Sequence, residues 1–167
     1  MVLTTSEPTL TERLLSLDTT EGYVYIAGKY GARRGTHDWT AYKEIDDNIN
    51  KAREWAIRFA NCGIPYLCPH LNSAHFEVFA PDVKPNYWYE ADIQMLARAT
   101  AIFLVEGWQE SKGAVAERAF CMQHGIPVYY AETESAPTEW GEPDFLTLCD
   151  NWGKQPRNGP FVIDRGV

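Results

Sequence analysis

Apolar and polar positions follow two rhythms along the chain, one typical of buried strands and one typical of amphipathic helices. Short apolar runs at residues 23–28, 64–68, 101–105 and 126–130 are rich in β-branched and aromatic side chains and predict strands. Between them, apolar or small residues recur at helical spacing and predict helices at residues 41–62, 87–99 and 112–124. The predicted order of elements is β-α-β-α-β-α-β.

This alternation of strands and helices predicts the fold class. A strand that is followed by a helix and another strand forms a right-handed crossover, so we expect parallel strands with helices on both faces. The run at residues 101–105 is apolar at every position, as expected for a central strand that is buried on both faces. We therefore expect an α/β protein with a single doubly wound domain, Rossmann-like or flavodoxin-like.

The expected core spans residues 22–131 and carries an extension at each end. Residues 1–21 are polar apart from a few leucines, which predict one helical turn docked on the domain. Residues 132–167 are rich in Glu, Pro, Gly and Trp, and residues 145–149 predict a last helix. We expect this C-terminal extension to pack on the core or on a partner subunit.

Composition and charge narrow the partners that the protein can have. The chain has 167 residues, 45% of them hydrophobic, which suits one folded domain. A formal net charge of -8 argues against general binding to nucleic acid or anionic membranes, because both need a basic surface. The chain has no apolar run of the roughly 18 to 20 residues that a membrane span needs. Four scattered cysteines and a polar N-terminus predict a cytoplasmic protein with free thiols.

The segment at residues 101–120 carries the strongest functional signal. It runs from an apolar strand through a Gly/Ser/Lys turn into a helix, where Glu117 lies among small and apolar residues. A carboxylate on the apolar side of a helix needs a partner or a function. In parallel sheets, ligands bind beyond the carboxyl ends of the strands. The alternative is an ordinary helix glutamate, solvated or paired with Arg98 or Arg118.

Three segments, in order, resemble the nucleoside 2-deoxyribosyltransferase-like superfamily. They are Tyr-Ile-Ala-Gly-Lys-Tyr-Gly from Tyr25, Ala-Asp ending at Asp92, and Ser-Lys-Gly-Ala-Val-Ala-Glu ending at Glu117. The superfamily includes transferases that exchange bases on deoxyribosides, 2'-deoxynucleoside 5'-monophosphate N-hydrolases, and many small phage and bacterial relatives. The resemblance covers residues 22–131 and implies a nucleoside or a nucleotide as the small-molecule substrate.

The resemblance also implies the catalytic groups. Glu117 is the expected nucleophile at C1' of the sugar, Asp92 is the expected acid that helps the base to leave, and Tyr25 lines the site beside them. An N-glycosidic bond breaks through an oxocarbenium-like state, so one carboxylate stabilises C1' while another group protonates the base. We expect hydrolysis ahead of base transfer. Asp92 is alternatively a first-turn carboxylate favoured by the helix dipole, with Glu90 as the fallback acid.

The turn before Glu117 predicts a phosphate site. Ser111, Lys112 and Gly113 are expected at the start of a helix, where free N–H groups and the helix dipole favour a phosphate. The resemblance implies that the serine and the glycine bind a 5'-phosphate. Ser111 is alternatively a helix cap followed by a tight turn, which needs no ligand.

The loop after the first strand is expected to complete the sugar and phosphate site. The resemblance implies that Gly28 lets the backbone approach the sugar. Lys29 departs from the small polar residue that several hydrolases have at this position, and an ammonium there favours nucleotides over nucleosides. Alternatively, Lys29, Arg33 and Arg34 form a solvated basic loop.

Aromatic side chains are candidates for stacking on a base. Tyr30, Trp88 and Trp108 are the three candidates, with Trp108 the best by position; the alternative for all three is packing in the core or at its rim. His70 lies in the long connection at residues 69–85, which is typical of a binding loop, and we expect it to face the ligand as a hydrogen-bonding group. The spacing of its His and Cys neighbours fits no zinc pattern, so neither a metal nor a cofactor is expected.

Two other functions remain open from the sequence. One is a nucleotide-sensing module that binds without turnover, because a fold does not prove an activity. The other, ranked lower, is hydrolysis of NAD or of a cyclic nucleotide signal, which shares the same chemistry at C1'. A homo-oligomer is expected because members of the superfamily commonly pair so that one subunit closes the site of the other. The segment at residues 139–152 would do this here or else pack over the sheet edge.

Overall fold

The computed structural model of the chain describes residues 7–17, 21–32, 39–131 and 144–154. Its strands form one parallel sheet in the order β2-β1-β3-β4. The strands are β1 (Val24–Ala27), β2 (Tyr66–Leu67), β3 (Ala101–Leu104) and β4 (Val128–Tyr130). Each lies within one of the four apolar runs, so the predicted parallel sheet is confirmed.

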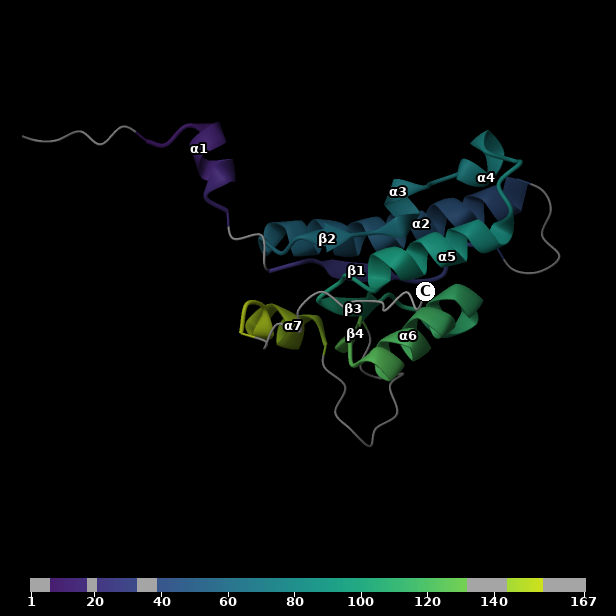
Figure 1. Cartoon of the computed structure of the whole chain (residues 1–167). Coiled ribbons are helices and arrows are strands. Elements are labelled where there is room, and N and C mark those ends of the chain that lie inside the picture. Colours follow the sequence, from purple (N-terminus) through teal and green to yellow (C-terminus); the bar gives the residue numbers. More distant parts are fainter. Residues whose placement is uncertain (1–6, 18–20, 33–38, 132–143, 155–167) are drawn as a thin grey trace, which may run out of the picture.

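The longer helices also match the helical pattern of the sequence (Figure 1). They are α2 (Trp39–Asn61), α5 (Pro85–Leu96), α6 (Lys112–His124) and α7 (Phe145–Asn151). The observed bounds of α6 coincide with the prediction, because Ser111 caps its start and Gly125 ends it in the left-handed region, at φ 69°. The short elements are α1 (Leu10–Leu15), α3 (Pro69–Asn72), α4 (Phe76–Phe79) and the 3-10 helix η1 (Trp108–Glu110).

The order in which strands are added to the sheet reverses at β1. From β1 the chain passes to β2 on one side and then to β3 on the other side. Tyr25 is therefore paired with Leu67 of β2 and with Ile102 of β3. In doubly wound sheets, connections that leave in opposite directions open a crevice at the carboxyl ends of the strands. The fold thus places a crevice beyond the ends of β1 and β3.

The two faces of the sheet are covered by different helices. Val24 and Ile26 of β1 pack in one cluster with α2 and α7, while Tyr25 and Ala27 pack in a second cluster with α5 and α6. The four residues alternate between the faces, as side chains of a strand do. Because β1 and β3 are interior strands, all of their side chains are buried. The prediction of a central strand at residues 101–105 is confirmed.

The two extensions of the core differ in how they lie relative to it, and some predicted features fall outside the described residues. The leucines at positions 10, 14, 15 and 17 are exposed, and Figure 1 shows α1 apart from the sheet, so the predicted docking of this turn is wrong. At the other end, α7 packs on the core through buried Leu148, as expected. Residues 139–143 and the basic pair Arg33 and Arg34 lie outside the described residues.

The predicted loop at residues 69–85 also differs from the structure, because it contains α3 and α4. Pro69 occupies the first turn of α3, where a proline is favoured since its missing N–H has no helical partner there. Each helix has only four residues, which is too short for a periodic pattern.

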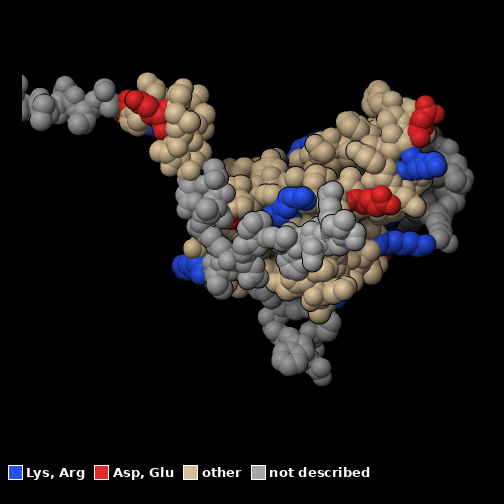
Figure 2. Space-filling model, viewed as in Figure 1, with Lys and Arg blue, Asp and Glu red and all other residues tan. Residues whose placement is uncertain are grey.

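Charged side chains are scattered over the face that Figure 2 shows, with most of the described surface there uncharged. No described helix is long and apolar enough to span a membrane. Among the described residues, no group of three or more His, Cys, Asp or Glu side chains is arranged to hold a metal ion.

Candidate active site

A cleft of about 760 Å³ lies where the topology predicts it, beyond the carboxyl ends of β1, β2 and β3. The first strand and the residues after it contribute Tyr25, Gly28, Lys29 and Tyr30. The helices contribute His70 from α3, Trp88 and Asp92 from α5, and Glu117 from α6, together with Ser111, Lys112 and Gly113 at the start of α6. The structure therefore brings together all the predicted site residues except Trp108.

Glu117 lies at the buried end of the cleft. Its residue is 9% exposed, and the Tyr25 hydroxyl donates a hydrogen bond of 2.6 Å to its Oε1 atom. The pKa of Glu117 is raised to about 7, mainly by burial and also by the charge of Asp92, although the Tyr25 hydrogen bond opposes this rise. The alternative of a solvated glutamate, or one paired with an arginine, is excluded by this burial and this partner.

Asp92 is the second carboxyl of the cleft and comes from α5. Partial burial raises its pKa to about 6. It lies in the middle of α5, seven residues after the first residue, Pro85, so the helix dipole does not account for its place. The fallback residue Glu90 is exposed and does not line the cleft.

The two carboxyls and Tyr25 influence one another's pKa values. Tyr25 is fully buried, and burial followed by the charges of Glu117 and Asp92 raises its pKa, so it remains a hydrogen-bond donor. Both carboxyls titrate close to neutral pH, where one can be ionised while the other still holds a proton. This arrangement can supply a nucleophile or base and an acid within one cleft.

The start of α6 lines the cleft. Ser111 Oγ accepts a hydrogen bond from the Ala114 N–H at 3.2 Å, so the capping role of Ser111 is observed. The side chain of Lys112 is exposed at the same helix start. A Cβ atom at Gly113 would lie 3.2 Å from the Tyr89 ring, so this glycine lets Tyr89 pack over the turn.

Lys29 lines the cleft, but its ammonium is already paired. Nζ lies 2.9 Å from Glu44 Oε1 and 2.9 Å from Glu110 Oε2. These hydrogen bonds raise the pKa of Lys29. Two carboxylates offset the single positive charge, so Lys29 is a weaker candidate for a phosphate than the sequence indicated.

Gly28 has a packing reason for its lack of a side chain. A Cβ atom there would lie 3.1 Å from Cβ of Val105, the residue that follows β3. The ends of β1 and β3 therefore approach each other closely at this point. This observation concerns packing and leaves the predicted contact of Gly28 with a sugar as a prediction.

Aromatic side chains lie together in part of the cleft wall, which we call the aromatic half. Tyr30, Trp88 and Phe76 line it, and the rings of Phe76 and Trp88 meet edge to face with centroids 6.0 Å apart. Trp108 lies elsewhere: its ring is 5.9 Å from the Tyr130 ring, and the Arg118 guanidinium is 5.4 Å from its centroid. The structure therefore gives Trp108 a packing position outside the cleft, unlike Tyr30 and Trp88.

His70 is the most unusual polar residue of the cleft wall. It is 6% exposed, and neither ring nitrogen has a hydrogen-bond partner among the described residues. Burial lowers its pKa, an effect that the nearby backbone of Lys29 partly offsets, so the imidazole is neutral at neutral pH. A buried polar group without a partner is costly, which makes His70 a natural contact for a polar ligand atom.

Several residues that line the cleft were not predicted as site residues, among them Phe76, Glu77, Tyr89 and Glu110. Tyr89 lies three residues before Asp92, and residues three apart on a helix share a face, so this signal was available. Phe76 and Glu77 belong to α4, a short helix in a segment for which the sequence predicts a loop. Glu110 enters through η1, whose left-handed N-cap, Gly107, turns the chain back toward the cleft.

The family model with the description "Domain of unknown function (DUF4406)" matches residues 23–130, more than half of the chain. The chain belongs to the DUF4406 family. The DUF4406 region contains the whole sheet and every residue of the cleft, whereas α1 and α7 lie outside it. No curated protein and no solved structure matches the chain.

Proposed function

We propose that the protein cleaves the N-glycosidic bond of (deoxy)nucleoside 5'-monophosphates. Glu117 is the nucleophile at C1', and Asp92 is the acid that protonates the departing base. Water then resolves the glycosyl-enzyme, or a second base does so in a transfer reaction. The observation that carries the proposal is the buried Glu117–Tyr25 pair facing one cleft with Asp92, where both carboxyls have raised pKa values.

The chemistry balances within this constellation. A Glu117 oxygen forms a bond to C1' as the C1'–N bond breaks, and the electron pair of that bond stays with the base, which takes a proton from Asp92. In the free protein Glu117 has the higher pKa of the two carboxyls. Positive charge that develops on the sugar favours ionised Glu117, so the remaining proton belongs on Asp92 in the transition state.

The remainder of the cleft suits the other parts of a nucleotide. The N–H groups at the start of α6, with Lys112, are suited to the 5'-phosphate. The aromatic half with Tyr30 and Trp88 is suited to a planar base, and neutral His70 is suited to a polar edge of that base. Pairing with a second subunit and a cytoplasmic location remain predictions of the sequence.

Base release tests the proposal. The protein is incubated with ribo- and deoxyribonucleoside 5'-monophosphates, including 5-modified pyrimidines, and free base is quantified by liquid chromatography. We expect release from at least one nucleotide, a loss of at least about 10³-fold in Glu117→Gln, and a loss of about 10²-fold in Asp92→Asn. Glu90→Gln is the matched control on α5, and we expect it to retain activity.

The same assay separates the alternatives. A second free base added to the mixture appears in a new nucleotide only if the protein is a transferase. A nucleotide that binds and persists intact supports the sensing function instead. Release that is equally fast in wild type and Glu117→Gln contradicts the nucleophile assignment.

A further inference from the structure

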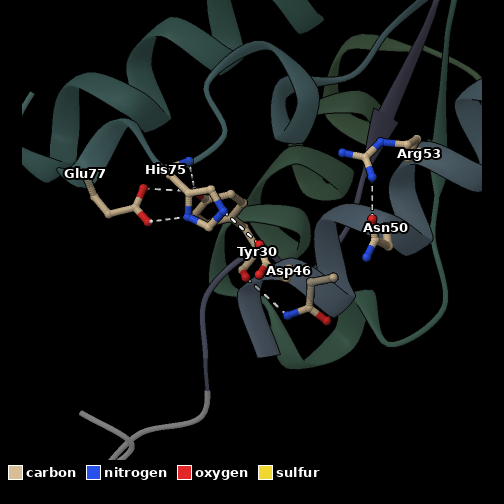
Figure 3. Close-up of polar contacts among 7 residues, drawn as sticks. Tyr30, Asp46, Asn50, Arg53, His75 and Glu77 are labelled. Atoms are coloured by element: carbon tan, nitrogen blue, oxygen red, sulfur yellow. Dashed lines mark hydrogen bonds and ion pairs between the residues drawn. The ribbon is translucent and has the colours of Figure 1, made fainter. Parts of the chain in front are cut away.

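A polar network beside the aromatic half of the cleft joins three separate segments (Figure 3). Its members are Tyr30 after β1, Asp46 of α2, His75 before α4, and Glu77 in the first turn of α4. Figure 3 shows the His75 ring between the carboxylates of Asp46 and Glu77. The network is largely exposed, apart from half-buried Tyr30 and His75.

The Tyr30 hydroxyl is held by two hydrogen bonds that come from the same segment. It accepts from the His75 backbone N–H at 2.8 Å and donates to Glu77 Oε2 at 2.9 Å. The backbone of Tyr30 is fixed separately, because Asn48 Nδ2 donates to its carbonyl oxygen at 3.2 Å. The ring position of Tyr30 in the cleft wall therefore depends on where His75 and Glu77 lie.

His75 is held in an unfavourable backbone conformation. Among the described residues, it is the single non-glycine residue with a positive φ, 59°. A left-handed conformation costs an ordinary residue about 1 kcal/mol or more and persists where surrounding contacts fix it. The shortest side-chain contact of His75 is from Nε2 to Asp46 Oδ1, at 2.8 Å, in which the carboxylate accepts and Nε2 carries the proton. Glu77 Oε1 lies 3.6 Å from Nδ1 on the other side of the ring.

His75 does not line the cleft, but the residues it fixes do. Phe76 and Glu77, which directly follow it, both line the aromatic half, as does Tyr30. The Tyr30 ring in turn meets the His70 ring edge to face, with centroids 5.5 Å apart. The contact between Asp46 and His75 is thus connected, through His75 and Tyr30, to the cleft wall.

We propose that His75, held by Asp46, is a positioning residue that fixes Tyr30, Phe76 and Glu77 in the wall of the base-binding half of the cleft. The inference rests on the proposed function, because that function assigns the base to this half. It adds a residue pair outside the cleft to the determinants of substrate binding. Small displacements of groups that orient a substrate reduce binding and rate strongly.

Substitution of Asp46 separates this role from general stability. Asp46→Ala removes the acceptor for His75 Nε2, Asp46→Asn keeps an acceptor oxygen, and Asp47→Ala is the matched control at the next position. Asp47 forms an exposed ion pair with Lys43 and has no contact with His75 in the described structure. Both positions, 46 and 47, are exposed on α2, so each of the three variants is expected to fold.

Amide hydrogen exchange without ligand gives the first readout, followed by kinetics on the nucleotide that releases base. In Asp46→Ala we expect the amides of residues 75–80 to exchange about tenfold faster and KM to rise about fivefold to tenfold with kcat within about twofold. Asp46→Asn should restore most of both values, and Asp47→Ala should match wild type.

The two readouts keep this inference apart from the proposed function. If wild type releases no base, the proposed function fails, while the exchange readout still decides whether Asp46 and His75 hold the wall. Equal exchange in Asp46→Ala and Asp47→Ala overturns the inference. Faster exchange in Asp46→Ala with an unchanged KM also overturns it, because the wall would then move without effect on the base.

Discussion

The two faces of the sheet are built from the same strands but differ in chemistry. On the face covered by α2 and α7, the Phe103 ring lies among those of Trp55, Phe59 and Phe145 in an apolar cluster. On the face covered by α5 and α6, Tyr25 lies in a cluster of mainly aliphatic residues, and the carboxyl of Glu117 is buried there. The first face is an ordinary core, whereas the second holds a group that opposes folding when it is ionised.

This difference indicates that one face of the sheet contributes mainly to stability and the other mainly to function. An aromatic core gains free energy from burial and ring contacts. A buried carboxyl with a raised pKa loses free energy when it ionises on folding. Such a group is retained for a function more readily than for stability. The comparison predicts opposite effects of substitution on the two faces.

Truncation on the aromatic face should have the largest effect on stability. Phe103 is fully buried, so Phe103→Ala should lower the free energy of unfolding by about 3 to 5 kcal/mol. Phe79, which is 80% exposed, is the matched control, and Phe79→Ala should stay within about 0.5 kcal/mol of wild type. Urea unfolding at pH 7 measures both variants. Equal losses in the two would show that the face is not the core.

On the carboxyl face, Glu117→Gln should raise stability, by a smaller amount that depends on pH. The folded pKa of Glu117, about 7, is above its ordinary value of 4.5, so its protonated form stabilises the fold below pH 4.5, and this contribution is lost as the pH rises to about 7. Gln stays neutral and keeps an acceptor for Tyr25. We expect a gain of roughly 1 to 3 kcal/mol at pH 8.

The gain should vanish near pH 4, where Glu117 of wild type is protonated. Unfolding curves of both proteins at pH 4 and pH 8 provide the measurement. A Gln variant that is less stable than wild type at pH 8 would mean that the carboxylate is favourably paired, and the contrast between the two faces would then be wrong.

Much of this fold was predictable from the sequence, because the strands and long helices bury regular apolar patterns. The α6 bounds followed from Ser111 and Gly125, and Glu117 was found because it interrupts an apolar face. The partners of Lys29 were not predictable, since Glu44 and Glu110 lie 15 and 81 residues away along the chain. The packing of Trp108 depends on Arg118 and Tyr130, which only the folded chain brings together.

The most direct test of the account is whether Glu117 becomes covalently bound to the sugar. A nucleotide that releases base is mixed with the protein, the reaction is quenched in acid, and digested peptides are measured by mass spectrometry. We predict a sugar 5-phosphate ester on the peptide that contains Glu117, absent in Glu117→Gln. Modification of another residue, or undiminished base release by Glu117→Gln, would contradict the account.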